Sequence, residues 1–214
     1  SWADASNPLI ILGTGSNFSP PPLTTTTTYT VTFTETNSGC TATDFVVITV
    51  DPGPTVIANV SPSSTVCAGA SITLTGSGTP STYTWNNGVT NGVAFLPPQA
   101  WWTNPPTPAV TTYTVTGTDV NNCVNTDTIT VTVNPLPNVV ATASPATICI
   151  NDPTTLTGSG AATYTWDNGA IDGIALNPTN TTTYTVTGTD VNNCINTDLI
   201  IVTVDRKSTR LNSS

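Results

Sequence analysis

Apolar residues alternate with threonine or serine along several short stretches of the chain. In one part of the sequence the apolar residues of these runs are Ile72 and Leu74; Tyr83 and Trp85; Tyr113 and Val115; and Ile129, Val131 and Val133. A later part repeats the pattern at Leu156, Tyr164, Trp166, Tyr184, Val186, Ile200, Val202 and Val204. Because successive side chains of a β-strand point to opposite faces, this period of two predicts strands with one apolar face.

Segments rich in glycine and asparagine separate the runs and predict turns. They are Gly76–Gly78, Asn86–Gly88, Asn91–Gly92 and the hairpin Asp119–Asn122 before Cys123. About seven short strands in roughly 70 to 80 residues, with a tryptophan in a central strand, is typical of an Ig-like β-sandwich. We therefore expect an all-β fold of tandem Ig-like (PKD-like) sandwiches, with Trp85 and Trp166 in their cores.

The chain repeats itself. Thr111–Cys123 reads TTYTVTGTDVNNC, Thr182–Cys194 is identical to it, and Thr27–Cys40 is a looser copy. A block that returns at intervals of about 70 to 85 residues predicts a string of small units rather than one large domain.

The predicted organisation follows from aligning these blocks. It comprises the C-terminal part of a truncated repeat at 1–50 (copy one), a repeat at 55–133 with a Trp/Pro-rich insertion at 97–110 (copy two), a repeat at 138–204 (copy three) and a non-native tail at 205–214. The linkers Asp51–Pro54 and Asn134–Pro137 are rich in proline, which favours short and fairly stiff connections.

Composition narrows the possible functions. The chain has 49 threonines, no histidine or methionine and a charged fraction of 7%, and its three basic residues all lie among the last nine positions. A surface without cations disfavours nucleic acid and anionic lipid as partners. General acid-base catalysis and nucleophilic triads usually require histidine, which this chain lacks, so we expect no enzyme activity in these residues. No apolar run is long enough for direct membrane insertion.

The tail from Asp205 to Ser214 resembles a translated sequencing adapter, with a basic linker as the alternative. The tail contains all the basic residues of the chain, and this abrupt change of charge comes directly after the Val-rich pattern of a predicted strand. We therefore exclude it from the fold prediction.

The segments Thr147–Gly160, Tyr164–Trp166, Thr181–Asp190 and Asn193–Cys194 resemble the Ig-like and PKD-like repeats of gliding-motility-associated bacterial surface proteins. The resemblance covers residues 1–204, except that copy two departs from it between Phe95 and Val110. It implies a large secreted or cell-surface protein, often exported through a type IX pathway, in which such repeats act as stalks, adhesin arms or spacers. The partners it implies are neighbouring Ig-like repeats and surface glycans or proteins.

The five cysteines fall into a repeating pattern of two in each full copy. Copy two has Cys67 and Cys123, copy three has Cys149 and Cys194, and Cys40 of copy one lacks a mate. Such a spread predicts disulfides in an oxidising compartment, with reduced core thiols as the alternative. In an Ig strand order the two cysteines of one copy lie at opposite ends of the domain, whereas a disulfide needs Cα atoms within about 7 Å. Two arrangements stay open: a different strand order with a disulfide inside each copy, or a bond from Cys67 to Cys194 of the next copy.

Two further sets of residues are candidate sites. Oxygen-bearing side chains recur at Asp119, Asn121, Asn125 and Asp127, and again at Asp190, Asn192, Asn196 and Asp198, a pattern compatible with calcium or simply with polar hairpins. Trp101 and Trp102 lie within the proline-rich insertion. We expect them either to form a platform for a sugar or protein ligand, or to belong to a loop that folds back over its own domain or against copy three. No other cofactor is expected.

These observations favour a non-catalytic extracellular array that acts as a stalk or adhesin arm. The alternative is a set of accessory modules, carbohydrate-binding ones included, of a secreted hydrolase whose catalytic domain lies outside these residues. A passive spacer without a ligand is a third possibility.

Overall fold

The computed structural model describes residues 1–99 and 107–205, with the backbone alone described for residues 7–10. These residues form 18 β-strands and no helix, so the predicted all-β fold class is confirmed. Within the described part, no helix of the length and hydropathy needed to cross a membrane is found.

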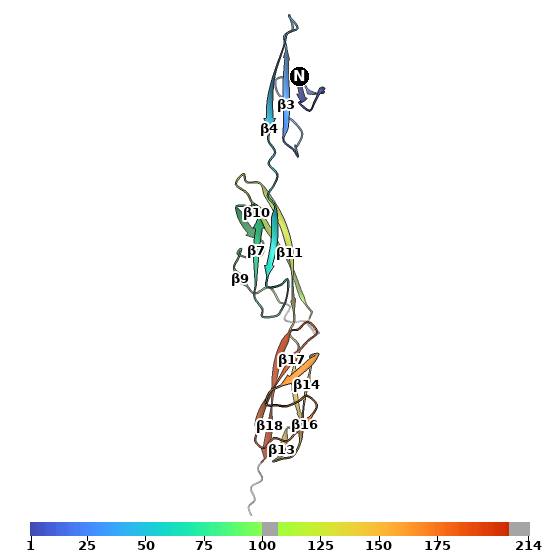
Figure 1. The fold of residues 1–214 in the computed structure, drawn as a ribbon, viewed down its shortest axis with the longest axis vertical. Coiled ribbons are helices and arrows are strands. Elements are labelled where there is room, and N and C mark those ends of the chain that lie inside the picture. The colour runs from blue at the N-terminus through green and yellow to red at the C-terminus, as the bar shows by residue number, and fades with distance from the viewer. Residues whose placement is uncertain (100–106, 206–214) are drawn as a thin grey trace, which may run out of the picture. The chain divides into compact units, whose positions relative to one another are not determined.

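Copy three is a sandwich of two sheets. Its seven strands are β12 (Val140–Ser144), β13 (Thr147–Cys149), β14 (Thr154–Ser159), β15 (Thr163–Trp166), β16 (Ala175–Leu176), β17 (Thr182–Thr189) and β18 (Ile195–Asp205). One sheet has the order β12-β14-β16 and the other the order β13-β18-β17-β15. The hairpin strands β17 and β18 lie side by side in Figure 1 and pair antiparallel along the whole of β17, whereas β13 pairs in parallel with the far end of β18.

The alternating residues of copy three form its core. Leu156 of β14, Val186 of β17 and Val202 of β18 are fully buried, and each such side chain stabilises the fold by about 1.5–3 kcal/mol. Trp166 packs against two clusters of core residues, one that contains Leu156 and Val202 and one that contains Val186. Its indole Nε1–H donates to Oδ1 of Asp172 at 2.9 Å, so the polar end of this large ring is satisfied.

Copy two has the same strand sequence and order. Its strands are β5 (Val56–Ser61), β6 (Thr65–Cys67), β7 (Ile72–Gly78), β8 (Thr82–Trp85), β9 (Ala94–Phe95), β10 (Ala109–Thr118) and β11 (Val124–Asn134). They form the sheets β5-β7-β9 and β6-β11-β10-β8. Seven of the predicted apolar positions are buried, namely Ile72, Leu74, Trp85, Tyr113, Val115, Val131 and Val133, whereas Tyr83 and Ile129 are half-buried. Seven strands in each complete copy match the number expected from the sequence.

The segment Gly76–Gly78, predicted as a turn, is instead the end of strand β7. Gly78 has φ +121°, and a Cβ atom on it would lie 1.9 Å from the carbonyl oxygen of Thr55. Gly160 in copy three has φ +88° and the same close approach, 1.9 Å, to the oxygen of Asn138. Glycine is therefore needed here for the close passage of two backbone segments rather than for a reversal of the chain.

Copy one is a single four-stranded sheet. Its strands β1 (Trp2–Asp4), β2 (Asn7–Gly13), β3 (Thr27–Thr34) and β4 (Thr41–Ile48) have the order β2-β1-β3-β4, and β3 and β4 lie side by side (Figure 1). The ring of Phe18 lies 5.9 Å from that of Trp2 and 5.4 Å from that of Tyr29, which is buried.

The chain divides into two compact units. One comprises Ser1–Ile57, Ser77–Tyr83 and Thr116–Thr126, and the other comprises Ala58–Gly76, Thr84–Val115 and the chain from Asp127 on. This division passes through copy two, and the domain limits drawn from the repeats stay a prediction. Asp205, the first residue of the predicted tail, belongs to β18, and the rest of that tail lies outside the described residues.

Candidate functional site

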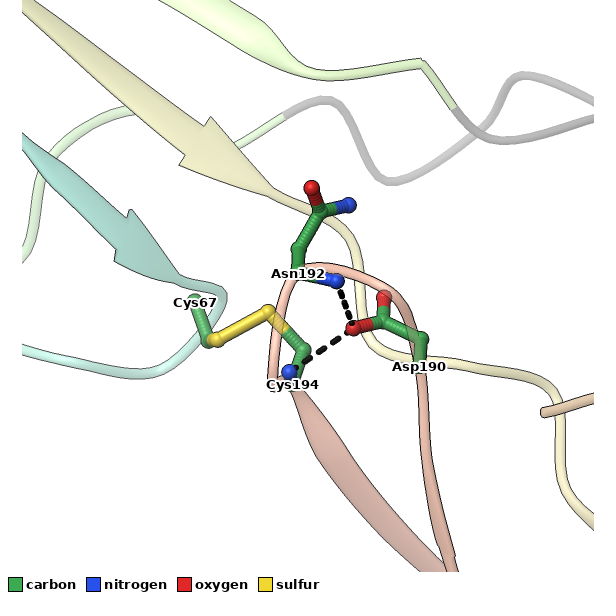
Figure 2. Close-up of a disulfide and its surroundings, with 4 residues drawn as sticks. All are labelled: Cys67, Asp190, Asn192 and Cys194. Carbon is green, nitrogen blue, oxygen red and sulfur yellow. Dashed lines mark hydrogen bonds between the residues drawn. A yellow bond between two sulfur atoms is a disulfide. The ribbon is translucent and has the colours of Figure 1, made fainter. Parts of the chain in front are cut away.

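A disulfide joins Cys67 of copy two to Cys194 of copy three, with their Cα atoms 5.5 Å apart (Figure 2). Cys67 is the last residue of β6, and Cys194 ends the turn between β17 and β18. Of the two arrangements left open by the sequence, the structure has the bond between copies. Pairings of Cys67 with Cys123 and of Cys149 with Cys194 inside single copies are therefore wrong for this structure.

The register of copy three explains why its own two cysteines do not meet. Cys149 pairs with Asp205 at the last residue of β18, whereas Cys194 immediately precedes the first residue of that strand. Strand β18 has 11 residues, which at about 3.3 Å per residue separates its ends by roughly 33 Å. That distance far exceeds the reach of a disulfide, so the expected Ig strand order excludes a bond inside the copy.

The linker between the two copies lies beside both halves of the disulfide. Next to Cys67, the backbone N–H of Ala68 donates to the carbonyl oxygen of Asn134 at 2.8 Å, where the linker begins. Two residues after Cys194, the amide of Asn196 donates from Nδ2 to the carbonyl oxygen of Pro137 at 3.0 Å, where the linker ends. The disulfide is thus a second covalent connection that runs parallel to the linker.

The hairpin that carries Cys194 is held by the carboxylate of Asp190. Its Oδ1 accepts the backbone N–H groups of Asn192 and Cys194, both at 2.8 Å (Figure 2). Asn193 adopts the left-handed conformation with φ +61°, which asparagine tolerates better than most residues. The side chain of Cys194 is fully buried. The turn therefore fixes the backbone of the cysteine before the adjoining strand begins.

The hairpin of copy two has the same hydrogen bonds without a disulfide. Oδ1 of Asp119 accepts the backbone N–H groups of Asn121 at 2.9 Å and Cys123 at 2.8 Å, and Asn122 has φ +61°. The linker before this copy is held as well, because Nδ2 of Asn125 donates to the carbonyl oxygen of Pro54 at 3.0 Å. The turn geometry is thus a property of the repeated sequence and does not depend on the crosslink.

The candidate calcium ligands serve as internal hydrogen-bond partners. Besides Asp119 and Asp190, Asp127 accepts the backbone N–H of Ala58 at 2.8 Å, and Asp198 accepts that of Ala141 at 2.8 Å. These backbone hydrogen bonds lower the pKa of both Asp127 and Asp198 below the ordinary value. Among the described residues no group of three or more Asp, Glu, His or Cys side chains could hold a metal ion. The calcium hypothesis, whose ligands include asparagines, stays a prediction.

Trp101 and Trp102 lie outside the described residues, and the ligand platform stays a prediction. The described residues before them help to line a hollow of about 270 Å³, formed by Asn87, Gly88, Val89, Thr90, Val93, Phe95, Leu96, Pro98 and Tyr113. The hydroxyl of Tyr113 is buried without a hydrogen-bond partner in the described part of the chain, and burial raises the pKa of this group.

Sequence reasoning missed one repeated polar contact near the core. Oδ1 of Asn91 accepts the indole N–H of Trp85 at 3.0 Å and the backbone N–H of Gly76 at 2.7 Å, and Asp172 does the same for Trp166 and Gly158 at 2.9 and 2.7 Å. The sequence does contain a sign of this contact, since an asparagine or aspartate follows each core tryptophan by six positions. These two residues are structural, because they anchor the tryptophan and the neighbouring strand.

The remaining cysteines Cys40, Cys123 and Cys149 are free thiols. Cys40 and Cys149 are exposed, and Cys123 is half-buried.

Comparison with known proteins found no family model that matches the chain and no significant match among curated proteins.

Proposed function

We propose that this chain belongs to a non-catalytic extracellular repeat array that acts as a stalk or adhesin arm of a large bacterial surface or secreted protein. The observation that carries the proposal is the disulfide from Cys67 to Cys194, because it joins two successive repeats across a linker. A connection of this kind is useful to a protein that must transmit force or resist proteolysis between modules.

The position of the disulfide determines which residues carry a pulling force. Force that enters copy two from its N-terminal side reaches Cys67, crosses to Cys194 and leaves along β18. The two cysteines are 127 positions apart in the sequence, and the backbone between them is protected from extension. In the chain-entropy model, a closed loop of this length stabilises the folded state by about 5 kcal/mol relative to the reduced protein.

A disulfide also supports a location outside the cytoplasm. Such bonds persist in oxidising environments, whereas cytosolic thiols are normally kept reduced. The threonine-rich strands and the acidic net charge of −9 are compatible with an exposed array whose modules repel one another.

The roles of the carboxylates support a structural function rather than catalysis. Asp119 and Asp190 hold the hairpins, while Asp127 and Asp198 hold the first strand of each copy. Asp172 holds Trp166. Each of these carboxylates therefore has an architectural partner within its own repeat.

Surface labelling of the organism that encodes the chain tests the proposal. Antibodies raised against residues 55–204 should label intact cells or the secreted fraction, and an in-frame deletion of these residues should reduce adhesion. Labelling that requires permeabilised cells would overturn the proposed location. Unchanged adhesion together with loss of a secreted hydrolase activity would favour the alternative, accessory modules of an enzyme. A glycan array probed with the chain and with the double variant Trp101→Ala, Trp102→Ala separates a ligand-binding arm from a passive spacer.

A further inference from the structure

We propose that the crosslink between copies two and three is one instance of a repeating junction. In this junction the cysteine at the end of the short second strand of one copy bonds to the hairpin cysteine of the next. The exposed Cys149 is then the docking site for the hairpin of a further copy of this repeat. Cys123 and Cys40 are hairpin cysteines of the same junction, and they take the strand cysteine of a preceding copy. This inference concerns how copies are joined and does not depend on the proposed role in adhesion.

Cys149 and Cys67 occupy equivalent positions in their sheets. Strand β6 pairs in parallel with the end of β11, with Cys67 opposite Asn134, and β13 pairs in parallel with the end of β18, with Cys149 opposite Asp205. Each cysteine is the last residue of its short strand and lies where the last strand of the copy ends. Cys149 therefore occupies in copy three the position from which Cys67 reaches the following copy.

The turns after the two cysteines are closed in the same way. The carbonyl oxygen of Cys67 accepts the N–H of Ala70 at 3.1 Å, and that of Cys149 accepts the N–H of Asp152 at 3.0 Å. The second residue after each cysteine has positive φ, +87° for Gly69 and +69° for Asn151. The backbone around Cys149 thus already has the conformation that accompanies the bond at Cys67.

The surface at Cys149 is open where its counterpart is covered. A hollow of about 410 Å³ adjoins Cys149 and is lined by Pro145, Thr147, Ile148, Cys149, Asp152, Pro153 and Asp205. Cys149 is exposed, whereas Cys67, bonded to the hairpin, is half-buried. The occupant of the equivalent surface in copy two is the hairpin of copy three, and this observation identifies the partner of Cys149 as another hairpin of the same sequence.

The hairpin half of the junction is also present without its partner. Asp119 holds Cys123 as Asp190 holds Cys194, and Asn125 binds the preceding linker as Asn196 does. Cys123 is half-buried while the bonded Cys194 is fully buried. Residues 1–50 contain a single cysteine, Cys40, which is itself in the hairpin position, so copy one as it stands offers Cys123 no strand cysteine.

The hairpin that contains Cys40 places its cysteine in the same way as the other two hairpins, although it uses different residues. The backbone N–H of Glu35 donates to the carbonyl oxygen of Cys40 at 2.8 Å, and Oγ of Ser38 accepts the N–H of Cys40 at 3.2 Å. Gly39 has φ +71°, in place of the left-handed asparagine of the other hairpins. All three hairpins therefore present a cysteine directly after a left-handed residue.

The chemistry of the junction is oxidation of two thiols. The sulfur atoms of Cys149 and the incoming hairpin cysteine form one S–S bond and lose two protons and two electrons. A low-molecular-weight disulfide such as oxidised glutathione accepts both and is reduced to two thiol molecules. No residue of the chain other than the two cysteines is changed.

An extended protein tests the inference. Residues 134–204 are added directly after Val204 of the chain, which supplies the natural linker and a fourth copy with its own hairpin cysteine. The strand cysteine of the added copy is replaced with serine, so that Cys149 is the only cysteine in its peptide sequence. After oxidative refolding in a glutathione buffer, non-reducing peptide mapping should find Cys67 and Cys149 each bonded to a hairpin cysteine. Because residues 1–204 lack lysine and arginine, pepsin rather than trypsin is the suitable protease.

Two controls distinguish this outcome from misfolding or random oxidation. Replacing the hairpin cysteine of the added copy with serine should leave Cys149 fully reactive to maleimide while the bond at Cys67 still forms. The variant Cys149→Ser of the extended protein should keep the β-sheet circular dichroism of the parent. Cys149 that stays alkylatable beside an intact added hairpin, or that bonds to any other cysteine, overturns the inference.

Discussion

Breaking the bond between Cys67 and Cys194 should lengthen the chain under force by a defined amount. With the disulfide intact, the backbone between the two cysteines cannot contribute to extension. The variant Cys194→Ser releases a sequence separation of 127 residues. At roughly 3.4 Å per residue of extended chain, this corresponds to about 430 Å of additional contour length.

Single-molecule force spectroscopy measures this difference directly. The whole chain is tethered by its two ends, without reducing agent, and the contour length of the fully extended molecule is compared between the parent and Cys194→Ser. Adding a reductant to the parent should give the same gain in length. The variant Cys123→Ser is the matched control, because it removes a hairpin cysteine that has no partner in this chain, and it should behave like the parent. Equal contour lengths for the parent and Cys194→Ser in the absence of reductant would refute the proposed load path.

Three further predictions follow from the contacts within the repeats. Backbone hydrogen bonds lower the pKa of Asp198 below its ordinary value of about 3.8. Its contribution to the stability of the fold is therefore complete above that value and is lost as the pH falls through the lower pKa of the folded state. The variant Asp198→Asn keeps an acceptor for the N–H of Ala141 and should make the melting temperature depend less on pH between about pH 5 and 2. An unchanged dependence on pH would contradict this. Replacing Asp190 with alanine removes the acceptor of two backbone N–H groups. The free energy of unfolding in urea should fall by about 1–2 kcal/mol, and the disulfide should reoxidise more slowly. Reoxidation at the rate of the parent would argue against a role of Asp190 in placing Cys194. Gly160→Ala should destabilise copy three by more than about 2 kcal/mol, because its Cβ would meet the carbonyl oxygen of Asn138 at 1.9 Å. Gly173 has a similar positive φ and no neighbour within 4 Å, so Gly173→Ala should cost only about 1 kcal/mol. Equal losses of stability would show that the cost comes from backbone strain and not from the close approach.

Local sequence accounts for the strands and for most of the core. The alternation that includes Leu156, Val186 and Val202 has a period of two, and these side chains are fully buried in the structure. The hairpins before Cys123 and Cys194 were also predictable, because aspartate and asparagine form such turns with their own neighbouring backbone. These features depend on residues close together in the chain.

The glycines of Gly76–Gly78 were misread because the same residue serves two purposes. Glycine permits a turn, but it also permits two backbones to pass closely, and the sequence does not distinguish these uses. Only the position of Thr55 beside Gly78 in the folded chain does so. Asn91 and Asp172 were missed for a related reason, since their partners are a tryptophan six residues away and a strand reached through the fold.

The sequence by itself determined the all-β class, the repeated unit, the apolar faces of its strands and the turns before Cys123 and Cys194. The tertiary structure alone decided which cysteines meet. Cys149 and Cys194 belong to the same copy, yet the length of β18 keeps them apart, while the short linker brings Cys194 to Cys67 of the preceding copy. A disulfide depends on the distance between two Cα atoms, and that distance follows from strand direction and from which ends of two copies adjoin, neither of which is encoded in the spacing of cysteines along the chain.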